Sequence, residues 1–266
     1  TLTPGTIQDW SSPTELQSFD VSSEETNPID VAFNGDGTEL YLIGNASDQL
    51  RKYTLSTAYD LTSTVTLVAS KSVSSQDGNP RSFTFNNDGT KFFMCGFGGS
   101  VHEYTMTTAY DIANASFSQS KSVSTNPQYP TGIRFNSDGT KMFLVGNGTA
   151  AFYEWALSTA FDISTATYTT TYDTTSDTSQ TTAHGMHINT DGTEFYIVNY
   201  QNGIYKFTAS TAYDISTLSY DSINSNLSSI DTSIGGFSFA NDTNTLIVAG
   251  GTGDSVYKVS IAKDAL

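Results

Sequence analysis

The sequence predicts an all-β fold, namely a five-bladed β-propeller of four-stranded antiparallel blades that is closed by an N-terminal strand completing the last blade. Three observations lead to this prediction. A hairpin motif recurs five times, four strand-like segments recur within each period, and the last period stops one strand short while a matching segment precedes the first. Four short strands repeated at roughly 40–50 residues are typical of propellers, because a single blade cannot bury its faces without neighbours.

The hairpin motif is clearest as FNNDGTKFFMCG, which begins at Phe85. An Asp-Gly pair between two apolar runs indicates a tight hairpin, because glycine accepts the positive φ that such a turn requires. The turn aspartates are separated by 52, 50, 53 and 51 residues, and the fifth turn lacks the glycine; they are Asp36, Asp88, Asp138, Asp191 and Asp242. This spacing predicts one hairpin for each blade.

The predicted closing strand is the segment LQSFDVS at residues 16–22, which aligns with VASKSVS at Val68 and SQSKSVS at Ser118. The fifth period ends after its third strand, SVYKVSI, so this segment should supply the missing fourth. Such closure removes the open sheet edges that invite aggregation. We therefore expect one domain over residues 1–266, with an N-terminal segment at 1–22 and blades near residues 23–74, 75–124, 125–176, 177–226 and 227–266 plus 16–22.

A polar corner separates the third and fourth strands of four periods, as in TTAYDI at Thr107 and STAFDI at Ser158. Its aspartate is suited to bonding nearby backbone amides in a compact turn. Because the copies are nearly identical, we expect their aromatic residues to serve the scaffold; these are Tyr59, Tyr110, Phe161 and Tyr213.

Composition excludes several classes of partner. The formal net charge is −16, from 27 acidic residues against 11 Lys and Arg. Such a field repels phosphate backbones and anionic lipid, so nucleic acid is not an expected partner. No stretch reaches the roughly 20 apolar residues of a membrane span, so we expect no membrane-spanning segment. The single cysteine, Cys95, is expected to be a small core residue.

The repeated pattern of apolar strand, DG turn, aromatic strand and V-x-E/K-Y resembles the YVTN and NHL types of propeller repeat. The fuller string FNxDGTKMFxVG…EYTLSTAYDIS resembles repeat proteins of marine bacteria and their phages, over almost the whole chain. This resemblance implies an extracellular or virion-surface location, and the families include adhesins, ligand-binding modules and some enzymes. The sequence departs from these families in two ways. The fifth turn lacks the DGT motif, and five blades are fewer than the six or seven that propellers of this kind more commonly have.

Candidate ligand-binding residues lie on the innermost predicted strands. Arg134 and His187 occupy equivalent positions on neighbouring blades, and Arg81 and His184 mark the starts of two of these strands. Together they predict a cationic cluster near one mouth of the channel, able to hold a carboxylate or another anion through the arginine fork. The alternative is that Arg134 pairs with an acid such as Asp30 across the channel and fills space.

The loops between strands form a second candidate surface, which should gather on one face of the disc. Exposed aromatic rings beside Asn, Asp and Gly are typical of sugar binding, because a ring stacks on a pyranose while amides take its hydroxyl groups. The aromatic candidates are Phe97, Tyr129 and Tyr200. The alternative is ordinary loop composition.

Metal and cofactor chemistry finds little support in the sequence. His184 and His187 form an H-x-x-H pair, but residues three apart on a strand point to opposite faces and would not share a zinc ion. The DGT turns lack the bidentate Glu of a calcium loop, so no cofactor is expected, although weak surface calcium stays open.

The functional prediction is a non-catalytic extracellular or virion-associated binding or scaffold module, carbohydrate-binding or adhesin-like, with a glycan or protein receptor as partner. It would be a monomeric domain or part of a larger assembly. No catalytic motif is present, and the inner strands carry one acid, Asp30, where a glycosidase requires two. The alternative is a glycoside-cleaving or other hydrolytic enzyme with its site at the channel.

Overall fold

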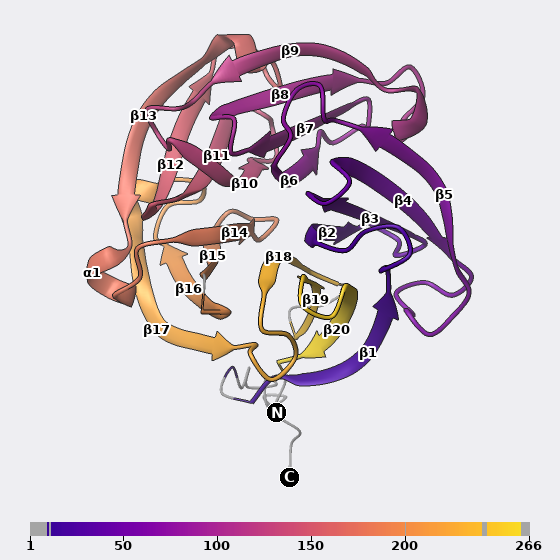
Figure 1. The fold of residues 1–266 in the computed structure, drawn as a ribbon. Helices are drawn as coiled ribbons and strands as arrows, with labels where there is room; N and C mark the ends of the chain where they lie inside the picture. Colours follow the sequence, from indigo (N-terminus) through magenta and orange to yellow (C-terminus); the bar gives the residue numbers. More distant parts are fainter. Residues whose placement is uncertain (1–9, 11, 200, 241–243, 262–266) are drawn as a thin grey trace, which may run out of the picture.

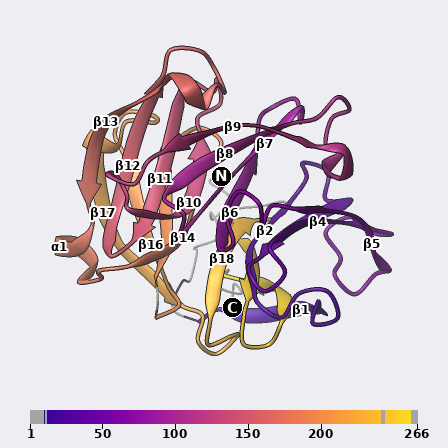
Figure 2. The same ribbon diagram turned by 45° about the horizontal axis from the view of Figure 1, so that its top comes forward.

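The computed structural model describes residues 10, 12–199, 201–240 and 244–261, and this part of the chain forms five four-stranded sheets. The sheets are arranged around a central axis like the blades of a propeller (Figure 1). Neighbouring strands within each sheet are antiparallel. In the tilted view of Figure 2, β11, β12 and β13 lie side by side, each farther from the axis than the one before. The predicted five-bladed propeller is confirmed.

The strands take equivalent places in all blades. The innermost strands are β2 (Pro28–Phe33), β6 (Pro80–Phe85), β10 (Tyr129–Phe135), β14 (Ala183–Ile188) and β18 (Ile234–Phe239). The second strands are β3 (Glu39–Gly44), β7 (Lys91–Gly96), β11 (Lys141–Asn147), β15 (Glu194–Asn199) and β19 (Thr245–Gly250).

The outer half of each blade is equally regular. The third strands are β4 (Gln49–Leu55), β8 (Ser100–Thr105), β12 (Thr149–Leu157), β16 (Gly203–Ala209) and β20 (Ser255–Ser260). The outermost strands are β5 (Val65–Ser72), β9 (Ser116–Ser122), β13 (Ala166–Asp173), β17 (Leu218–Asn226) and β1 (Thr14–Asp20). Short 3₁₀ turns lie before three outermost strands, namely η1 (Ile112–Asn114), η2 (Ile163–Thr165) and η3 (Ile215–Thr217), and the four-residue α1 (Thr175–Thr178) precedes β14.

The N-terminal strand β1 completes the last blade, as predicted. It pairs antiparallel with β20, from Thr14 opposite Ser260 to Asp20 opposite Ser255. Two contacts then tie this blade to the corner of the first. Gln17 donates to the Asp60 carboxylate at 2.9 Å, and the Lys258 ammonium donates to the backbone oxygen of Tyr59 at 2.8 Å. The two ends of the repeat array are therefore joined by backbone pairing and by side chains.

The second strand of each blade is buried on both faces, because it is covered by the neighbouring blades. Successive side chains of β7 point to opposite faces. Phe92 and Met94 pack into the cluster shared with the first blade, whereas Phe93 and Cys95 pack into the cluster shared with the third. Cys95 is fully buried, and burial raises the pKa of its thiol. The prediction of a small core residue at this position is confirmed.

The corner aromatics pack on the glycines of the DGT turns. Gly89 has a φ of 69°, and a Cβ atom there would overlap the ring of Tyr110, whose own φ is 60°. The same contact joins Gly37 to Tyr59, Gly139 to Phe161, and Gly192 to Tyr213. In all four repeats the corner aromatic therefore packs against its turn, in agreement with the structural role predicted for these residues.

Lysines fasten each corner to the preceding blade. Lys91 donates to the backbone oxygen of Phe161 at 2.8 Å and pairs with the buried Glu103 at 2.9 Å. Lys141 repeats this arrangement with the backbone oxygen of Tyr213 and with Glu154. These lysines are committed to contacts between blades and within them.

We predict that Gly139→Ala destabilises the fold more than Gly148→Ala. Both glycines have a positive φ, of 74° and 90°, but only at Gly139 would the added Cβ overlap a side chain, that of Phe161. Backbone strain should cost each variant about 1 kcal/mol, and the overlap should cost Gly139→Ala about 2 kcal/mol more. Urea unfolding measures both losses, and equal losses would contradict the packing role of the corner aromatics.

We also predict that deleting residues 1–22 opens the ring. The deletion removes β1 and leaves the edge of β20 unpaired, so the protein should aggregate and unfold at a lower temperature. Light scattering and thermal unfolding report this change, and a peptide of residues 12–22 added in trans should reverse it. A truncated protein as soluble and heat-stable as the parent would show that closure does not depend on β1.

Candidate ligand-binding site at the propeller axis

Two cavities lie at opposite ends of the inner strands. The larger, about 610 Å³, is lined by residues near the strand starts, including Ile29, Arg81 and His184, and is called here the N-end cavity. The smaller, about 310 Å³, is lined by residues near the ends of the same strands, including Arg134 and His187, and is called the C-end cavity. His184 lines one cavity and His187, three residues later on the same strand, lines the other. Because a strand rises by about 3.3 Å per residue, these two positions are about 10 Å apart along the axis.

The space between the two cavities is filled. The Asp30 carboxylate accepts a hydrogen bond from the Ser82 hydroxyl at 2.6 Å and pairs with Arg134 at 3.5 Å. A Cβ atom at Gly236 would lie 2.5 Å from Asp30, and one at Gly235 would overlap the backbone of β2. The two cavities share no lining residue. Within the described part of the chain, the expected channel is therefore two blind cavities.

The four predicted cationic residues do not form one cluster. Arg81 and His184 lie in the N-end cavity, whereas Arg134 and His187 lie in the C-end cavity. The prediction of a single cluster at one mouth fails, because the two histidines are three residues apart on one strand and reach opposite ends of it.

Arg134 takes the structural role that the sequence offered as an alternative. It pairs with Asp30, and its Nη1 donates to the backbone oxygens of Phe83 at 3.1 Å and Ile133 at 2.7 Å. Burial raises the pKa of Asp30, although Arg134 and the hydrogen bonds of that carboxylate oppose the shift. Arg134 thus fastens the second and third blades to Asp30 at the centre of the ring.

His187 lies among aromatic rings, with its imidazole centre 5.0 Å from that of Phe239. Burial, and to a smaller extent the nearby Arg134, lower its pKa to about 3. The imidazole is therefore neutral at neutral pH, so His187 is not the cationic group that the sequence predicted. Its Nδ1 atom is buried without a hydrogen-bond partner in the described residues.

Arg81 differs from the other two arginines of the chain. Arg51 pairs with Glu25 at 3.1 Å and Arg134 pairs with Asp30, whereas Arg81 forms no ion pair within the residues that the structure describes. Its guanidinium lies 4.0 Å from the centre of the Phe97 ring, and its Nε is buried without a hydrogen-bond partner there. Burial lowers the pKa of Arg81, although Asp77 opposes the shift. An arginine remains charged in such surroundings, so a positive group lines the N-end cavity.

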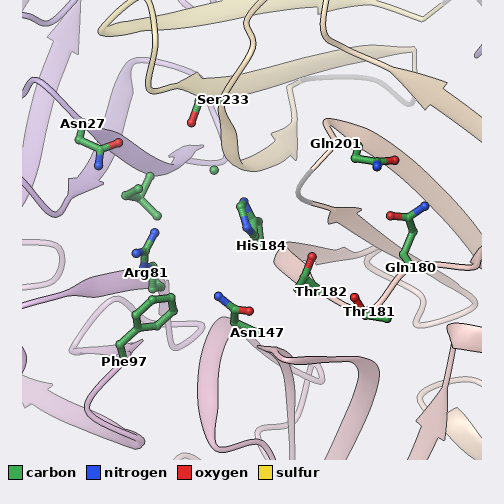
Figure 3. A pocket seen from close by; sticks show the side chains of 12 residues that line it. Asn27, Arg81, Phe97, Asn147, Gln180, Thr181, Thr182, His184, Gln201 and Ser233 are labelled. Carbon is green, nitrogen blue, oxygen red and sulfur yellow. The ribbon is translucent and has the colours of Figure 1, made fainter.

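The remaining lining of the N-end cavity is neutral and polar. Figure 3 shows Arg81 and Phe97 on one side, Gln180 and Gln201 on the other, and His184 between them. Burial, followed by the charge of Arg81, lowers the pKa of His184, and a hydrogen bond with the backbone of Ile234 opposes this. All five blades contribute, and the amide and hydroxyl side chains are Asn27, Asn147, Gln180, Gln201, Thr181, Thr182 and Ser233. The cavity offers many hydrogen-bonding groups and no carboxylate among its described lining residues.

Acidic residues position the loops around this cavity. The Asp77 carboxylate accepts hydrogen bonds from the backbone amides of Asn79 at 2.8 Å and Gly98 at 2.9 Å. Asp231 accepts from Ser233 and Gly253 in the fifth blade. This role was not predicted from the sequence, although Asp77 in QDGNP occupies the place of Glu25 in EETNP, 52 residues earlier, and Glu25 also accepts from backbone amides.

Two of the three predicted loop aromatics lie side by side next to the N-end cavity. The rings of Phe97 and Tyr129 lie 5.7 Å apart, centre to centre, and line a groove of about 550 Å³ beside the N-end cavity. Tyr200 lies outside the described residues. The loops between second and third strands reach the same end of the disc as the starts of the inner strands, since Phe97, Asn147 and Gln201 all line the N-end cavity.

The described residues contain neither a metal-binding cluster nor a membrane-spanning helix. Within the described residues, no group of three or more His, Cys, Asp or Glu side chains is placed to hold a metal ion. The turn aspartates are used locally, because Asp88 accepts from the amide of Thr90 at 2.9 Å and hydrogen bonds from Thr90 lower the pKa of Asp88. The helices in the described part of the chain are all too short or too polar to cross a membrane.

Comparison with known proteins identifies the fold alone. No family model matches the sequence, and no curated protein matches it. A candidate 6-phosphogluconolactonase from Bacteroides fragilis superposes with a TM-score of 0.51 at 18% identity, over 79% of this chain and 58% of that one.

Two further solved structures are similar to a lesser degree. A functionally unknown protein from Desulfotomaculum acetoxidans gives a TM-score of 0.48 at 12% identity, over 84% of this chain and 62% of that one. A candidate 6-phosphogluconolactonase from Bacteroides uniformis gives 0.49 at 13%, over 82% and 59%. The chain thus spans about three fifths of the length of these structures, and at such identities the likeness concerns the fold and not the activity.

We predict that His187 makes the protein less stable in acid. In the unfolded chain this histidine takes up a proton near pH 6.5, whereas in the folded protein it resists protonation down to about pH 3. The free energy of unfolding should therefore fall with decreasing pH across this window. His187→Phe should lessen the fall by up to about 1.4 kcal/mol per pH unit. Urea titrations between pH 7 and pH 4 measure the slope, and identical slopes for both proteins would contradict the lowered pKa.

Proposed function

We propose that this chain is a non-catalytic binding module whose N-end cavity takes a saccharide carrying a carboxylate. The observation that carries the proposal is Arg81, a half-buried arginine without an ion pair in the described residues, which lines a cavity of amides and hydroxyls. The planar guanidinium matches the two oxygens of a carboxylate. Its stacking on Phe97 orients it without using its hydrogen-bond donors.

The other lining groups support a sugar rather than a simple anion. Side-chain amides both donate and accept hydrogen bonds, so residues such as Asn147, Gln180 and Gln201 can satisfy the hydroxyl groups of a pyranose. A volume of about 610 Å³ falls within the range of small-molecule sites, about 300–1,000 Å³. An anionic ligand also requires a local positive group, because the net charge of −16 otherwise repels it.

A glycoside-cleaving enzyme is the alternative, and it has weaker support. Hydrolysis of a glycoside generally uses two carboxyl groups about 5–10 Å apart. The described lining of either cavity contains no Asp or Glu, and Asp30 lies between the cavities in an ion pair with Arg134. Release of reducing sugar from a bound glycan would favour this alternative.

The cellular setting is part of the same proposal. The resemblance of the repeats to those of marine bacteria and phages supports an extracellular or virion-surface location. A glycan receptor bound by an adhesin-like module fits that location and the chemistry of the cavity.

We predict that a glycan array detects binding to uronate-containing glycans and that Arg81→Met weakens it. Methionine keeps much of the side-chain volume but removes the charge and the donors, so affinity should fall about 10- to 100-fold. Lys121→Met is the matched control, because it removes one positive charge from β9 on the outer edge of the second blade. Calorimetry with the best glycan measures both variants.

Two outcomes would contradict this proposal. One is a preference for neutral glycans that Arg81→Met leaves unchanged. The other is an equal loss of binding in Arg81→Met and Lys121→Met, which would indicate a general effect of charge rather than a site at Arg81.

A further inference from the structure

We propose that the protein binds acidic oligosaccharides by their ends, with the terminal uronate in the N-end cavity and the next sugar against Phe97 and Tyr129. This inference rests on the proposed function and adds a second subsite to it. The juxtaposition that carries it is an aromatic pair at the boundary between the cavity and a neighbouring groove.

The N-end cavity admits a chain end but not the middle of a chain along the axis. Its floor is closed, because Asp30, Ser82 and Arg134 fill the centre of the ring and Gly235 lies against the backbone of β2. A ligand that enters along the axis must stop there. Any continuation of that ligand has to leave sideways.

A sideways path exists between the second and third blades. The groove of about 550 Å³ shares Phe97 and Asn147 with the N-end cavity and continues over Tyr129 and Tyr153. Phe97 is therefore a wall of both spaces. Arg81 stands 4.0 Å from the centre of its ring, and the ring of Tyr129 lies 5.7 Å away with an interplanar angle of 54°.

The aromatic pair takes the place that an amide pair takes at the boundary before it. Between the first and second blades, the equivalent positions are Asn45 and Asn79, whose side chains are joined by a hydrogen bond of 2.9 Å. Phe97 follows Gly96 as Asn45 follows Gly44, and Tyr129 precedes a proline as Asn79 does. The residues at these two positions differ from one boundary to the next, and in the sequence the boundary between the second and third blades is the one with two aromatic rings.

Tyr129 is well placed to stack on a sugar. Its side chain is 42% exposed, although its backbone lies in β10 opposite Asn147. An exposed ring on a paired strand offers a flat apolar face at a fixed position, so the side chain loses little conformational freedom when a ligand binds. Asn147 borders the cavity and the groove and can hydrogen-bond sugars on either side.

The test compares galacturonate with trigalacturonate, by calorimetry on the full chain. The trimer should bind the native protein about 2- to 10-fold more tightly than the monomer, through stacking of one further ring. Tyr129→Asn, which restores the amide found at the equivalent positions of the first two blades, should abolish this difference and leave monomer binding unchanged. Arg81→Met should weaken both ligands by the same factor. Tyr168→Asn on the outermost strand β13 should change neither.

Each outcome distinguishes the inference from the proposal beneath it. If trimer and monomer bind equally to the native protein, or if Tyr129→Asn weakens both equally, end-on binding is overturned while the acidic-saccharide site stands. If several protein molecules load along one chain of long polygalacturonate, recognition is internal and the inference is likewise overturned. If neither ligand binds the native protein, the proposed function fails and the inference fails with it.

Discussion

The close approach of the five inner strands at the axis is the constraint on which the rest of the structure depends. Only glycine fits at Gly235 and Gly236, because a side chain there would meet β2 and Asp30. The remaining central space is occupied by the hydrogen-bonded group of Asp30, Ser82 and Arg134. The ring can then close with five blades, and closure converts a channel into two blind cavities of different chemistry.

Most of the few cationic residues form ion pairs or hydrogen bonds that hold the blades together. Lysines such as Lys91 and Lys141 are committed to the corners of the next blade and to buried glutamates. Arg134 is committed to the centre of the ring, and Arg51 to Glu25. In an acidic protein whose basic side chains largely serve the fold, an arginine without an ion pair in the described residues stands out as a site for an external anion. Arg81 is that residue.

Comparison of the five repeats also distinguishes the loop residues that support the fold from those that are candidates for binding. Positions that agree between blades have structural explanations, as shown by the packing of Tyr110 on Gly89 and by the loop-holding carboxylates of Asp77 and Asp231. The residues that face one another at the boundaries between blades vary, and Phe97 and Tyr129 form an aromatic pair at one of them, beside the cavity that contains Arg81. A binding site can be added at such a place, because the side chains there lie at the ends of strands and in loops, outside the packed core of the blades.

The sequence by itself determined the five blades, the closing strand and the structural role of the corners. A tight turn depends on a few neighbouring residues, so the pair Asp88 and Gly89 was enough to predict a hairpin. The repeat shows the same strand pattern several times, so the segment at residues 16–22 could be identified as the missing fourth strand by its likeness to the other copies. The tertiary structure alone decided how the candidate site is divided. Arg81 and Arg134 lie on neighbouring inner strands, but one faces an open cavity and the other meets Asp30, and the sequence could not show this. Contacts across the axis depend on how far each strand extends along it and on which blade lies opposite, and both are set by packing between blades.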